Sequence, residues 1–216
     1  MKNRFVLLLM SIVIFSACNS KAQKSQAMQK ETTRGEFQEA TFGAGCFWCV
    51  EAIFEEVEGI QSVVAGYAGG HKENPTYKQV VRGTTGHAEV TRIVFDPSVV
   101  SYEELLEVFW HTHNPTTKNK QGADVGPQYR SVIFYHNEEQ KKIAKNSLVD
   151  TDRSDLWKDP IVTEIEPISN YTQAENYHQN YYANNPNAGY CTVVIAPKLK
   201  KFRSEFSHML KDGKSP

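Results

Sequence analysis

The sequence predicts one mixed α/β domain in which helices pack against a sheet. Short apolar segments with the composition of strands alternate with longer segments whose apolar residues recur every three or four positions, as in helices. The 216 residues are enough for one large domain. Their 40% hydrophobic and 23% charged content is that of an ordinary globular protein. Because strands and helices succeed one another, we expect an α/β sandwich rather than an all-β fold or a helical bundle.

The first half of the domain is expected to hold strands and helices in alternation. Apolar side chains at spacings of three and four mark the first helix, and a capping box formed by Ser101 and Glu104 opens the second. An Asp-Pro pair ends the strand between them. In chain order we expect a strand at 40–42, a helix at 46–57, strands at 60–67 and 88–95, and a helix at 101–111.

The second half begins with a long segment, residues 112–126, that shows no period and is predicted to be a loop. Asn137 is expected to cap a helix, and Thr172 with Glu175 forms a second capping box. We expect a strand at 129–135, helices at 137–150 and 172–182, a strand at 192–195 and a closing helix at 198–210.

The first residues have the pattern of a bacterial export signal. Lys2 and Arg4 precede an apolar run that ends in Ser-Ala-Cys and is shorter than the roughly 20 residues that span a membrane. The residues up to Cys18 look like a lipobox, in which the cysteine becomes the lipidated first residue of the mature chain. An ordinary secretory signal and an uncleaved anchor are the alternatives.

These patterns divide the chain into three parts. We expect a lipoprotein signal peptide at residues 1–17, a flexible, lipid-anchored tether at 18–35 and the folded domain at 36–216. The tether assignment depends on its polar composition and its lack of aromatic residues. The domain would then lie outside the cytoplasm, anchored to a bacterial membrane on its periplasmic side or at the outer membrane.

The charge balance argues against one class of partner. Lys and Arg number 24 against 25 for Asp and Glu, which gives a net charge of −1. Because no basic excess is available to neutralise phosphates, nucleic acid is not an expected partner. Four cysteines are too few for a disulfide scaffold in a chain of this size, so their positions carry the interpretation.

Cys46 lies where a glycine-rich turn, residues 43–45, meets the first predicted helix. Free amide groups and the positive end of the helix dipole favour the thiolate there, so we expect a reactive cysteine. Glycines let the backbone turn tightly and leave the sulfur open to a substrate. The alternative is an inert, buried cysteine.

Cys46 and Cys49 also form a Cys-x-x-Cys pair. It has three interpretations: a thioredoxin-like redox pair, half of a zinc site, or a nucleophile with a nearby partner. Phe47 and Trp48 inside the pair are unlike the small residues or proline of thioredoxin-like sites. A zinc site needs two further ligands, and the available candidates show no paired spacing: His111, His113, His178 and Cys191.

The segment GCFWCVE resembles the signature of the A class of peptide methionine sulfoxide reductases. Further motifs of that family follow in the same order, and together they cover about residues 40–206: GYAGG, NPTY, GHAE, FDP, HNPTTKNKQGADVGPQYRS and AENYHQNYY. The resemblance implies an α/β (α+β) sandwich built on a ferredoxin-like core. It also implies repair of oxidative damage by reduction of methionine S-sulfoxide, free or in oxidised proteins. No cofactor or metal is expected, and the electrons would come from a thioredoxin-like donor.

The resemblance implies roles for individual residues. Cys46 would attack the sulfoxide sulfur, and Glu89 would hold the sulfoxide oxygen and protonate it. Phe47 and Trp48 would form the apolar wall that receives the substrate's methyl group. Two hydroxyl donors to the oxygen and a carboxylate that organises the pocket complete the set: Tyr77, Tyr129 and Asp124. From the residues alone, four of these groups also fit structural roles: Glu89 as a solvated charge, Tyr77 and Tyr129 as core edges, and Asp124 as a turn residue.

Two cysteines are candidates to resolve the sulfenic acid that the reaction leaves on Cys46. Cys49 lies three positions on, on the same helical face. Cys191 resembles the resolving cysteine of a GYC segment in the family, and the Pro- and Gly-bearing loop before it, residues 184–189, is expected to swing to the active site. We favour Cys191 over Cys49, and a relay through both is a further possibility.

Two other functions fit parts of the sequence. The Cys-x-x-Cys pair alone is compatible with a general thiol–disulfide oxidoreductase. The aromatic residues and the export signal together are compatible with a non-catalytic lipoprotein that binds a peptide or a glycan. Activity toward each epimer of methionine sulfoxide, with dithiothreitol as reductant, separates these functions from the reductase.

Overall fold

The structure is a computed structural model that describes residues 36–214. The predicted signal peptide and tether, residues 1–35, lie outside the described residues, so these predictions stay untested. Within residues 36–214, no helix has the length and apolar content needed to cross a membrane.

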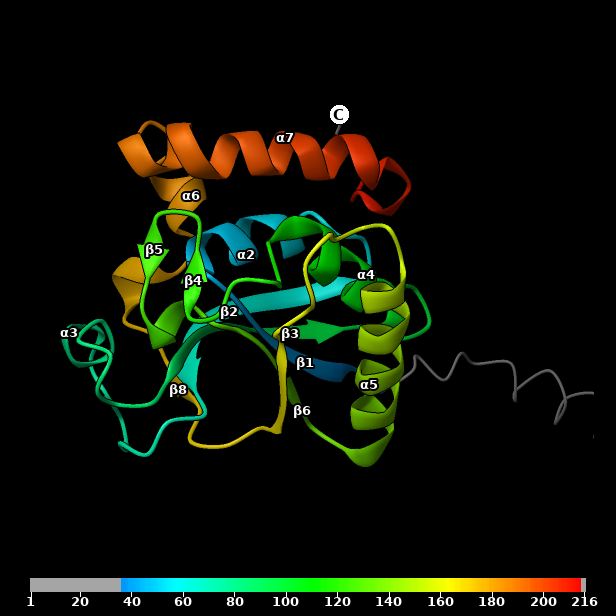
Figure 1. Ribbon diagram of the computed structural model, residues 1–216. Coiled ribbons are helices and arrows are strands. Elements are labelled where there is room, and N and C mark those ends of the chain that lie inside the picture. The colour runs from blue at the N-terminus through cyan, green and yellow to red at the C-terminus, as the bar shows by residue number, and fades with distance from the viewer. Residues whose placement is uncertain (1–35, 215–216) are drawn as a thin grey trace, which may run out of the picture. The chain divides into compact units, whose positions relative to one another are not determined.

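A six-stranded sheet forms the centre of the domain (Figure 1). Its strands follow the order β7-β6-β1-β3-β2-β8, and only β6 and β7 run parallel to each other. β1 pairs with β3 on one side and with β6 on the other, so it is a central strand. The bounds are β1 Gln38–Ala44, β2 Ile60–Ala68, β3 Ala88–Phe95, β6 Ser131–Tyr135, β7 Glu164–Pro167 and β8 Thr172–Gln173.

Four longer helices and several short ones complete the described part of the chain. The longer ones are α2 (Phe47–Phe54), α4 (Tyr102–Thr112), α5 (Glu138–Arg153) and α7 (Ala196–Glu205). The short ones are α3 (Tyr77–Val80), α6 (Tyr181–Asn184), three 3-10 turns (Pro127–Tyr129, Asn176–His178 and Ser207–Met209) and a π-helical turn (Cys191–Ile195).

The succession β1-α2-β2-β3-α4-β6 is the βαββαβ pattern of a ferredoxin-like fold. Its four strands lie in the spatial order fourth, first, third, second, as that fold requires. The predicted fold class, an α/β sandwich on a ferredoxin-like core, is therefore confirmed.

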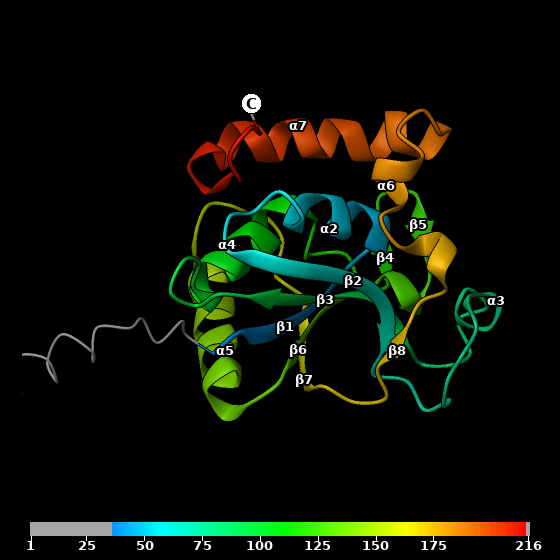
Figure 2. The ribbon, with the colours of Figure 1, turned by 180° about the vertical axis from the view of Figure 1, so that it is seen from behind.

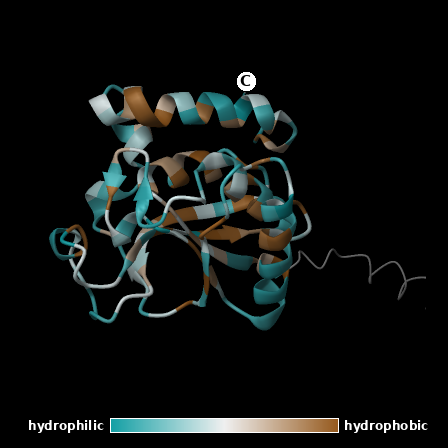
Figure 3. Ribbon diagram, in the orientation of Figure 1, coloured by the Kyte–Doolittle hydropathy of each residue, from teal (hydrophilic) through white to brown (hydrophobic). Residues whose placement is uncertain are grey.

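The helices are not spread evenly over the sheet. α2 packs on β2 and β3, and α7 lies across α2 and also contacts α4 (Figure 2). α5 packs against α4, β6 and β7 at one end of the domain. Hydrophobic residues are concentrated in the strands and in the helices that cover them, whereas the ribbon of α5 is largely hydrophilic (Figure 3).

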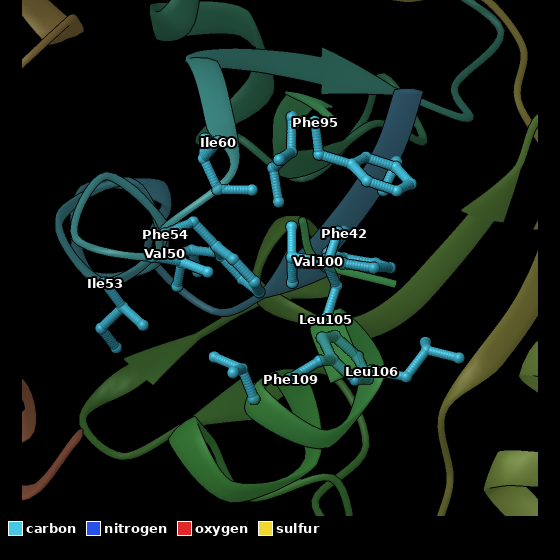
Figure 4. Packing of buried hydrophobic residues seen from close by; sticks show 14 of the residues in the cluster. Phe42, Val50, Ile53, Phe54, Ile60, Phe95, Val100, Leu105, Leu106 and Phe109 are labelled. Carbon is cyan, nitrogen blue, oxygen red and sulfur yellow. The ribbon is translucent and has the colours of Figure 1, made fainter. Parts of the chain in front are cut away.

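The main core lies between the sheet and the helices α2, α4 and α7. Phe42 of β1 is fully buried, and its ring lies 5.7 Å from that of Phe54 and 5.2 Å from that of Phe109 (Figure 4). These contacts join the central strand to α2 and α4, so they fix the direction in which α2 leaves the end of β1.

Several predicted elements are confirmed with small changes in their bounds. The strand at 88–95 has the predicted limits, and the capping boxes or caps predicted for α4 and α5 form: Glu104 N–H donates to Ser101 Oγ at 3.2 Å, and Gln140 N–H donates to Asn137 Oδ1 at 2.9 Å. The predicted loop at 112–126 is partly wrong, because it contains a small hairpin, β4 (Lys120–Gln121) with β5 (Asp124–Val125).

Two predictions near the C-terminus are wrong. Residues 172–182 do not form one helix, because their first two residues pair with β2 as β8. The strand predicted at 192–195 is instead a π-helical turn that continues into α7. Its β-branched residues favour a strand, but Cys191 and Ile195, four positions apart, are both fully buried, and packing of that face outweighs the local preference.

Candidate active site

The site begins at the junction of β1 and α2. Gly45 has a φ of +89°, and a Cβ added there would lie 2.5 Å from Gln121 Cγ, so only glycine fits this turn. Cys46 follows as the N-cap of α2, in extended conformation, and only 8% of its surface is exposed. The predicted placement of Cys46 between a glycine turn and a helix is confirmed.

Glu89 lies next to this junction although it is distant in sequence. It belongs to β3, where it pairs with Tyr67 of β2, and it is 2% exposed. Its Oε2 accepts the N–H of Phe47 at 3.2 Å. Burial raises the pKa of Glu89 to about 8, with a smaller contribution from the charge of Asp124. At neutral pH most Glu89 carboxyls therefore carry a proton.

Two tyrosines and an aspartate surround this carboxyl. Burial raises the pKa of Tyr77 to about 12 and that of Tyr129 above its ordinary value, and for each the charge of Glu89 is the next contribution. Both phenols are therefore protonated donors within electrostatic reach of Glu89. Asp124, at the start of β5, accepts a hydrogen bond from Tyr190 Oη–H at 2.7 Å. The structure thus brings the three predicted residues to the same region.

Trp48 is held on several sides. Its ring stacks on Tyr181 with a centroid distance of 3.6 Å and an interplanar angle of 7°. Its Nε1–H donates to Nδ1 of His178 at 3.2 Å, and Tyr190 meets it edge-on. The neighbouring Phe47 is almost fully buried, with its ring 5.0 Å from that of His178. An aromatic wall therefore stands beside Cys46.

Sequence reasoning missed two carboxylates that hold this wall. Glu51 is 1% exposed and accepts the backbone N–H groups of Asn180 at 2.9 Å and Tyr181 at 3.2 Å. Burial raises the pKa of Glu51 to about 7. Because Asn180 has a φ of +51°, this carboxyl fixes a left-handed turn just before the residue that stacks on Trp48.

The second missed carboxylate is Glu175. It accepts Tyr67 Oη–H and Tyr77 N–H, each at 2.8 Å. Glu51 and Glu175 belong to the motifs GCFWCVE and AENYHQNYY, but nothing in these motifs shows which backbone groups the carboxylates bind.

The thiols of Cys46 and Cys49 affect each other's pKa. Burial raises the pKa of Cys46 well above its ordinary value, and a hydrogen bond to Cys49 and the charge of Glu89 raise it further. The expectation that the helix start favours the Cys46 thiolate is therefore wrong. A helix terminus stabilises a nearby thiolate by about 0.3–1 kcal/mol, which lowers its pKa by less than about 1 unit. Full burial can raise the pKa by about 3 units or more, so burial is the larger effect.

Cys49 shows the opposite shift. Its pKa is lowered to about 7, first because the Cys46 thiol donates to its sulfur and then through the charge of Lys198. Tyr190 Oη lies 3.9 Å from the Cys49 sulfur. Of the two sulfurs, that of Cys49 is therefore the one that ionises first.

Cys191 lies in the same apolar cluster as Cys46 and Cys49 and is fully buried. Burial raises its pKa, and the charge of Cys49 raises it further. All three sulfurs are free thiols in this structure. The loop expected before Cys191, at residues 184–189, is found at residues 185–188, because α6 ends at Asn184 and helical structure resumes at Gly189. Its swing to the active site stays a prediction.

Two other features lie away from these residues. A cavity of about 730 Å³ opens between α4 and α5, lined in part by Trp110, Ser147 and Asp150, and it contains none of the predicted site residues. Within residues 36–214, no group of three or more His, Cys, Asp or Glu side chains is arranged to hold a metal ion.

Comparisons with known proteins agree with this geometry. A family described as peptide methionine sulfoxide reductase matches residues 38–210. Peptide methionine sulfoxide reductase MsrA 1 of Rhodopirellula baltica is 52% identical over 87% of this chain and 96% of its own length. An Acinetobacter baumannii MsrA is 54% identical over 81% of this chain and 99% of its own length.

Solved structures show the same fold. The crystal structure of Mxr1 from Saccharomyces cerevisiae in reduced form shares 34% identity, covering 72% of this chain and 90% of that one, with a TM-score of 0.67. Methionine sulfoxide reductase A of Corynebacterium diphtheriae shares 33% identity over 73% of this chain and 80% of that one, with a TM-score of 0.63. From the match over most of its length and these relatives, the chain belongs to the peptide methionine sulfoxide reductase family.

Proposed function

We propose that this chain reduces methionine S-sulfoxide, free or in oxidised proteins, to methionine, with Cys46 as its nucleophile. Membership of the family supports the reaction. One observation supports the residue assignment above the others: the amide that follows Cys46 is hydrogen-bonded to Glu89, a buried carboxyl whose pKa of about 8 keeps it protonated at neutral pH. A nucleophilic thiol and a protonated carboxyl therefore lie next to each other, as removal of a sulfoxide oxygen requires.

In the first step the Cys46 sulfur attacks the sulfoxide sulfur. The Cys46 proton passes to the Cys49 sulfur, to which it is already hydrogen-bonded. Glu89 donates its proton to the oxygen, which leaves the substrate and stays on Cys46 as a sulfenic acid. The substrate is reduced by two electrons to methionine, and Cys46 is oxidised by two electrons.

The other site residues orient the substrate. Phe47 and Trp48 provide the apolar wall for the methyl group, and burying a methyl there also excludes water from the sulfur. Tyr77 and Tyr129 are protonated phenols near Glu89, and they would donate to the sulfoxide oxygen while it gains negative charge. Asp124 holds Tyr190 beside the thiols.

The sulfenic acid is then resolved in two exchanges. The Cys49 thiol attacks the Cys46 sulfur, which forms a Cys46–Cys49 disulfide and releases water. Cys191 attacks the Cys49 sulfur, which frees Cys46 and leaves a Cys49–Cys191 disulfide. This relay, with Cys49 first, takes the place of the direct attack by Cys191 that the sequence favoured. It is supported by the burial of all three cysteines in one apolar cluster, by the hydrogen bond between Cys46 and Cys49, and by the electrostatic interaction of Cys191 with Cys49. A thioredoxin-like dithiol donor reduces the final disulfide.

The reaction is tested by purified protein with dithiothreitol and each epimer of methionine sulfoxide. We expect turnover of the S epimer only, and none with Cys46→Ser, since a hydroxyl at this position is a much weaker nucleophile. Circular dichroism should show that the variant is folded. Ser98→Ala, on an exposed turn, is the control variant and should keep the turnover of the unmodified chain. Appreciable turnover by Cys46→Ser would contradict the assignment.

We also propose that Cys18 carries lipid and tethers the domain to a bacterial membrane outside the cytoplasm. The basic start, the apolar run and the small residues before Cys18 support this proposal. In cells, Cys18→Ala should give an uncleaved precursor or a soluble product in place of a detergent-partitioning mature protein. Equal mass and equal detergent partitioning of the two forms would exclude lipidation.

A further inference from the structure

The three most exposed large hydrophobic side chains among the described residues lie beside the active site. They are Val193 at 74%, Val125 at 69% and Tyr177 at 61% exposure, and the others on the surface range from 37% to 53%. Val193 follows Cys191 by two positions, Val125 follows Asp124, and Tyr177 precedes His178. Single exposed apolar residues are common and need no explanation, but a set that borders one site indicates a contact surface.

The two valines and the tyrosine border different parts of the site. The ring of Tyr177 lies 4.2 Å from that of His178, which contacts Phe47 and Trp48 on the side of the methyl wall. Val125 and Val193 instead flank the hydrogen bond between Asp124 and Tyr190, which joins the β4–β5 hairpin to the helical segment that carries Cys191. Both ribbon views show this hairpin next to the start of that segment (Figures 1 and 2). The valines thus lie on the side of the resolving thiols.

The segments that carry the valines are rich in lysine, although Asp124 directly precedes Val125. Residues 185–204, which include Val193, contain no Asp or Glu, and the hairpin and its approach contribute further cations. The lysines concerned are Lys118, Lys120, Lys198, Lys200 and Lys201. Lys198 is near enough to Cys49 for its charge to lower the pKa of that thiol. Two exposed valines on lysine-rich segments suit a partner that presents an apolar centre and acidic surroundings.

We propose that Val125 and Val193 form the docking surface for the dithiol protein that reduces the Cys49–Cys191 disulfide. This inference rests on the proposed function. A donor thiolate attacks the Cys191 sulfur and forms a mixed disulfide, while Cys49 leaves as a thiolate. The donor's second thiol then attacks the donor's first sulfur in the mixed disulfide, which releases Cys191 as a thiol. The donor is oxidised by two electrons to a disulfide, and this chain is reduced by two electrons.

The geometry favours the donor over the oxidised protein substrate as the occupant. The substrate needs the methyl wall, which Tyr177 borders, whereas the donor needs only the sulfur of the resolving pair. Cys191 itself is fully buried in this reduced structure, so exposed neighbours must make the first contact with a macromolecule. Dithiothreitol is small and needs no such contact, which separates docking from chemistry.

The test compares two reductants with the full chain and free methionine S-sulfoxide as substrate. One reductant is dithiothreitol, and the other is a bacterial thioredoxin that is recycled by its reductase and NADPH. Val193→Asp and Val125→Asp should each raise the apparent KM for thioredoxin about fivefold or more, because they place a carboxylate in an apolar contact facing an acidic partner. Turnover with dithiothreitol should be unchanged. Val99→Asp, at a valine that is 53% exposed and remote in sequence, is the matched control and should change neither value.

The outcomes are distinct. An unchanged KM for thioredoxin in both variants would overturn the proposal. So would a raised KM for an oxidised protein substrate, measured with dithiothreitol, without a change for thioredoxin, because the surface would then belong to the substrate. If either variant unfolds, Val193→Ser and Val125→Ser, with smaller expected effects in the same direction, replace it. Absence of any turnover by the unmodified chain with dithiothreitol would instead refute the proposed function, and the docking proposal with it.

Discussion

Replacement of Glu89 by Gln tests the central step of the proposed mechanism. The first step requires a protonated Glu89, with a pKa of about 8, and an ionised Cys49, with a pKa of about 7, to receive the Cys46 proton. The fraction of molecules in both states is about 0.6 near pH 7.5 and about 0.1 at pH 9. The rate of the first step should therefore rise through pH 7, reach a maximum near pH 7.5 and fall about sixfold by pH 9.

In Glu89→Gln the descending limb should disappear, because the amide does not titrate. The amide still donates a hydrogen bond to the sulfoxide oxygen, so we expect residual activity, lowered about 100-fold at pH 7.5 by the loss of the proton donor. The assay is a single turnover without reductant, in which rapid quenching and mass spectrometry follow methionine formation. Glu51→Gln, at a second buried carboxyl nearby, is the control and should keep the descending limb.

Two results would refute this reasoning. One is a rate for the unmodified chain that stays constant up to pH 9, because it would show that no group titrating near pH 8 donates the proton. The other is a Glu89→Gln profile that still falls above pH 8, because another acid would then be responsible.

Two further predictions concern the thiols and the carboxyl of Glu51. In Cys191→Ser, one equivalent of methionine S-sulfoxide without reductant should leave a Cys46–Cys49 disulfide, which peptide mapping detects. The unmodified chain should end with Cys49 bridged to Cys191. A Cys46–Cys191 bond that forms at full rate in Cys49→Ser would contradict this order. The pKa of Glu51 is raised to about 7, so the native state binds more protons than the unfolded state between about pH 4.5 and 7. The contribution of this carboxyl to the free energy of unfolding therefore decreases as the pH rises through that window. Relative to Glu51→Gln, the unmodified chain should lose up to about 3 kcal/mol between pH 4.5 and 8 in urea unfolding, and a constant difference would exclude this account.

The sequence predicts well what depends on local pattern. The strand at 88–95 and the start of α2 follow from short-range alternation, spacing and glycine chemistry, and both are confirmed. The capping box expected at Thr172 and Glu175 is wrong because tertiary partners compete for the same groups. Glu175 binds Tyr67 and Tyr77 instead of a helix start, and Thr172 pairs with β2.

The same distinction separates the predicted site residues from the missed ones. Cys46 is identified by its own turn, and the family resemblance supplied Glu89. The contact of Glu51 with Asn180 joins residues 129 positions apart, so no local pattern indicates it. The pKa of Cys46 could not be derived from the helix start either, because burial, which the sequence does not give at this position, is the larger effect.

The central place of β1 has a consequence for synthesis of the chain. β1 is the first described strand to leave the ribosome, yet its two partners lie far downstream: Gln38 pairs with Phe95 and Thr41 pairs with Phe134. Until residue 95 has emerged, the strand carries two unpaired edges, and the edge that faces β6 stays unpaired until residue 135 has emerged. Unpaired strand edges are the kind of segment that aggregates or recruits a chaperone. The middle of the sheet is therefore closed late in synthesis.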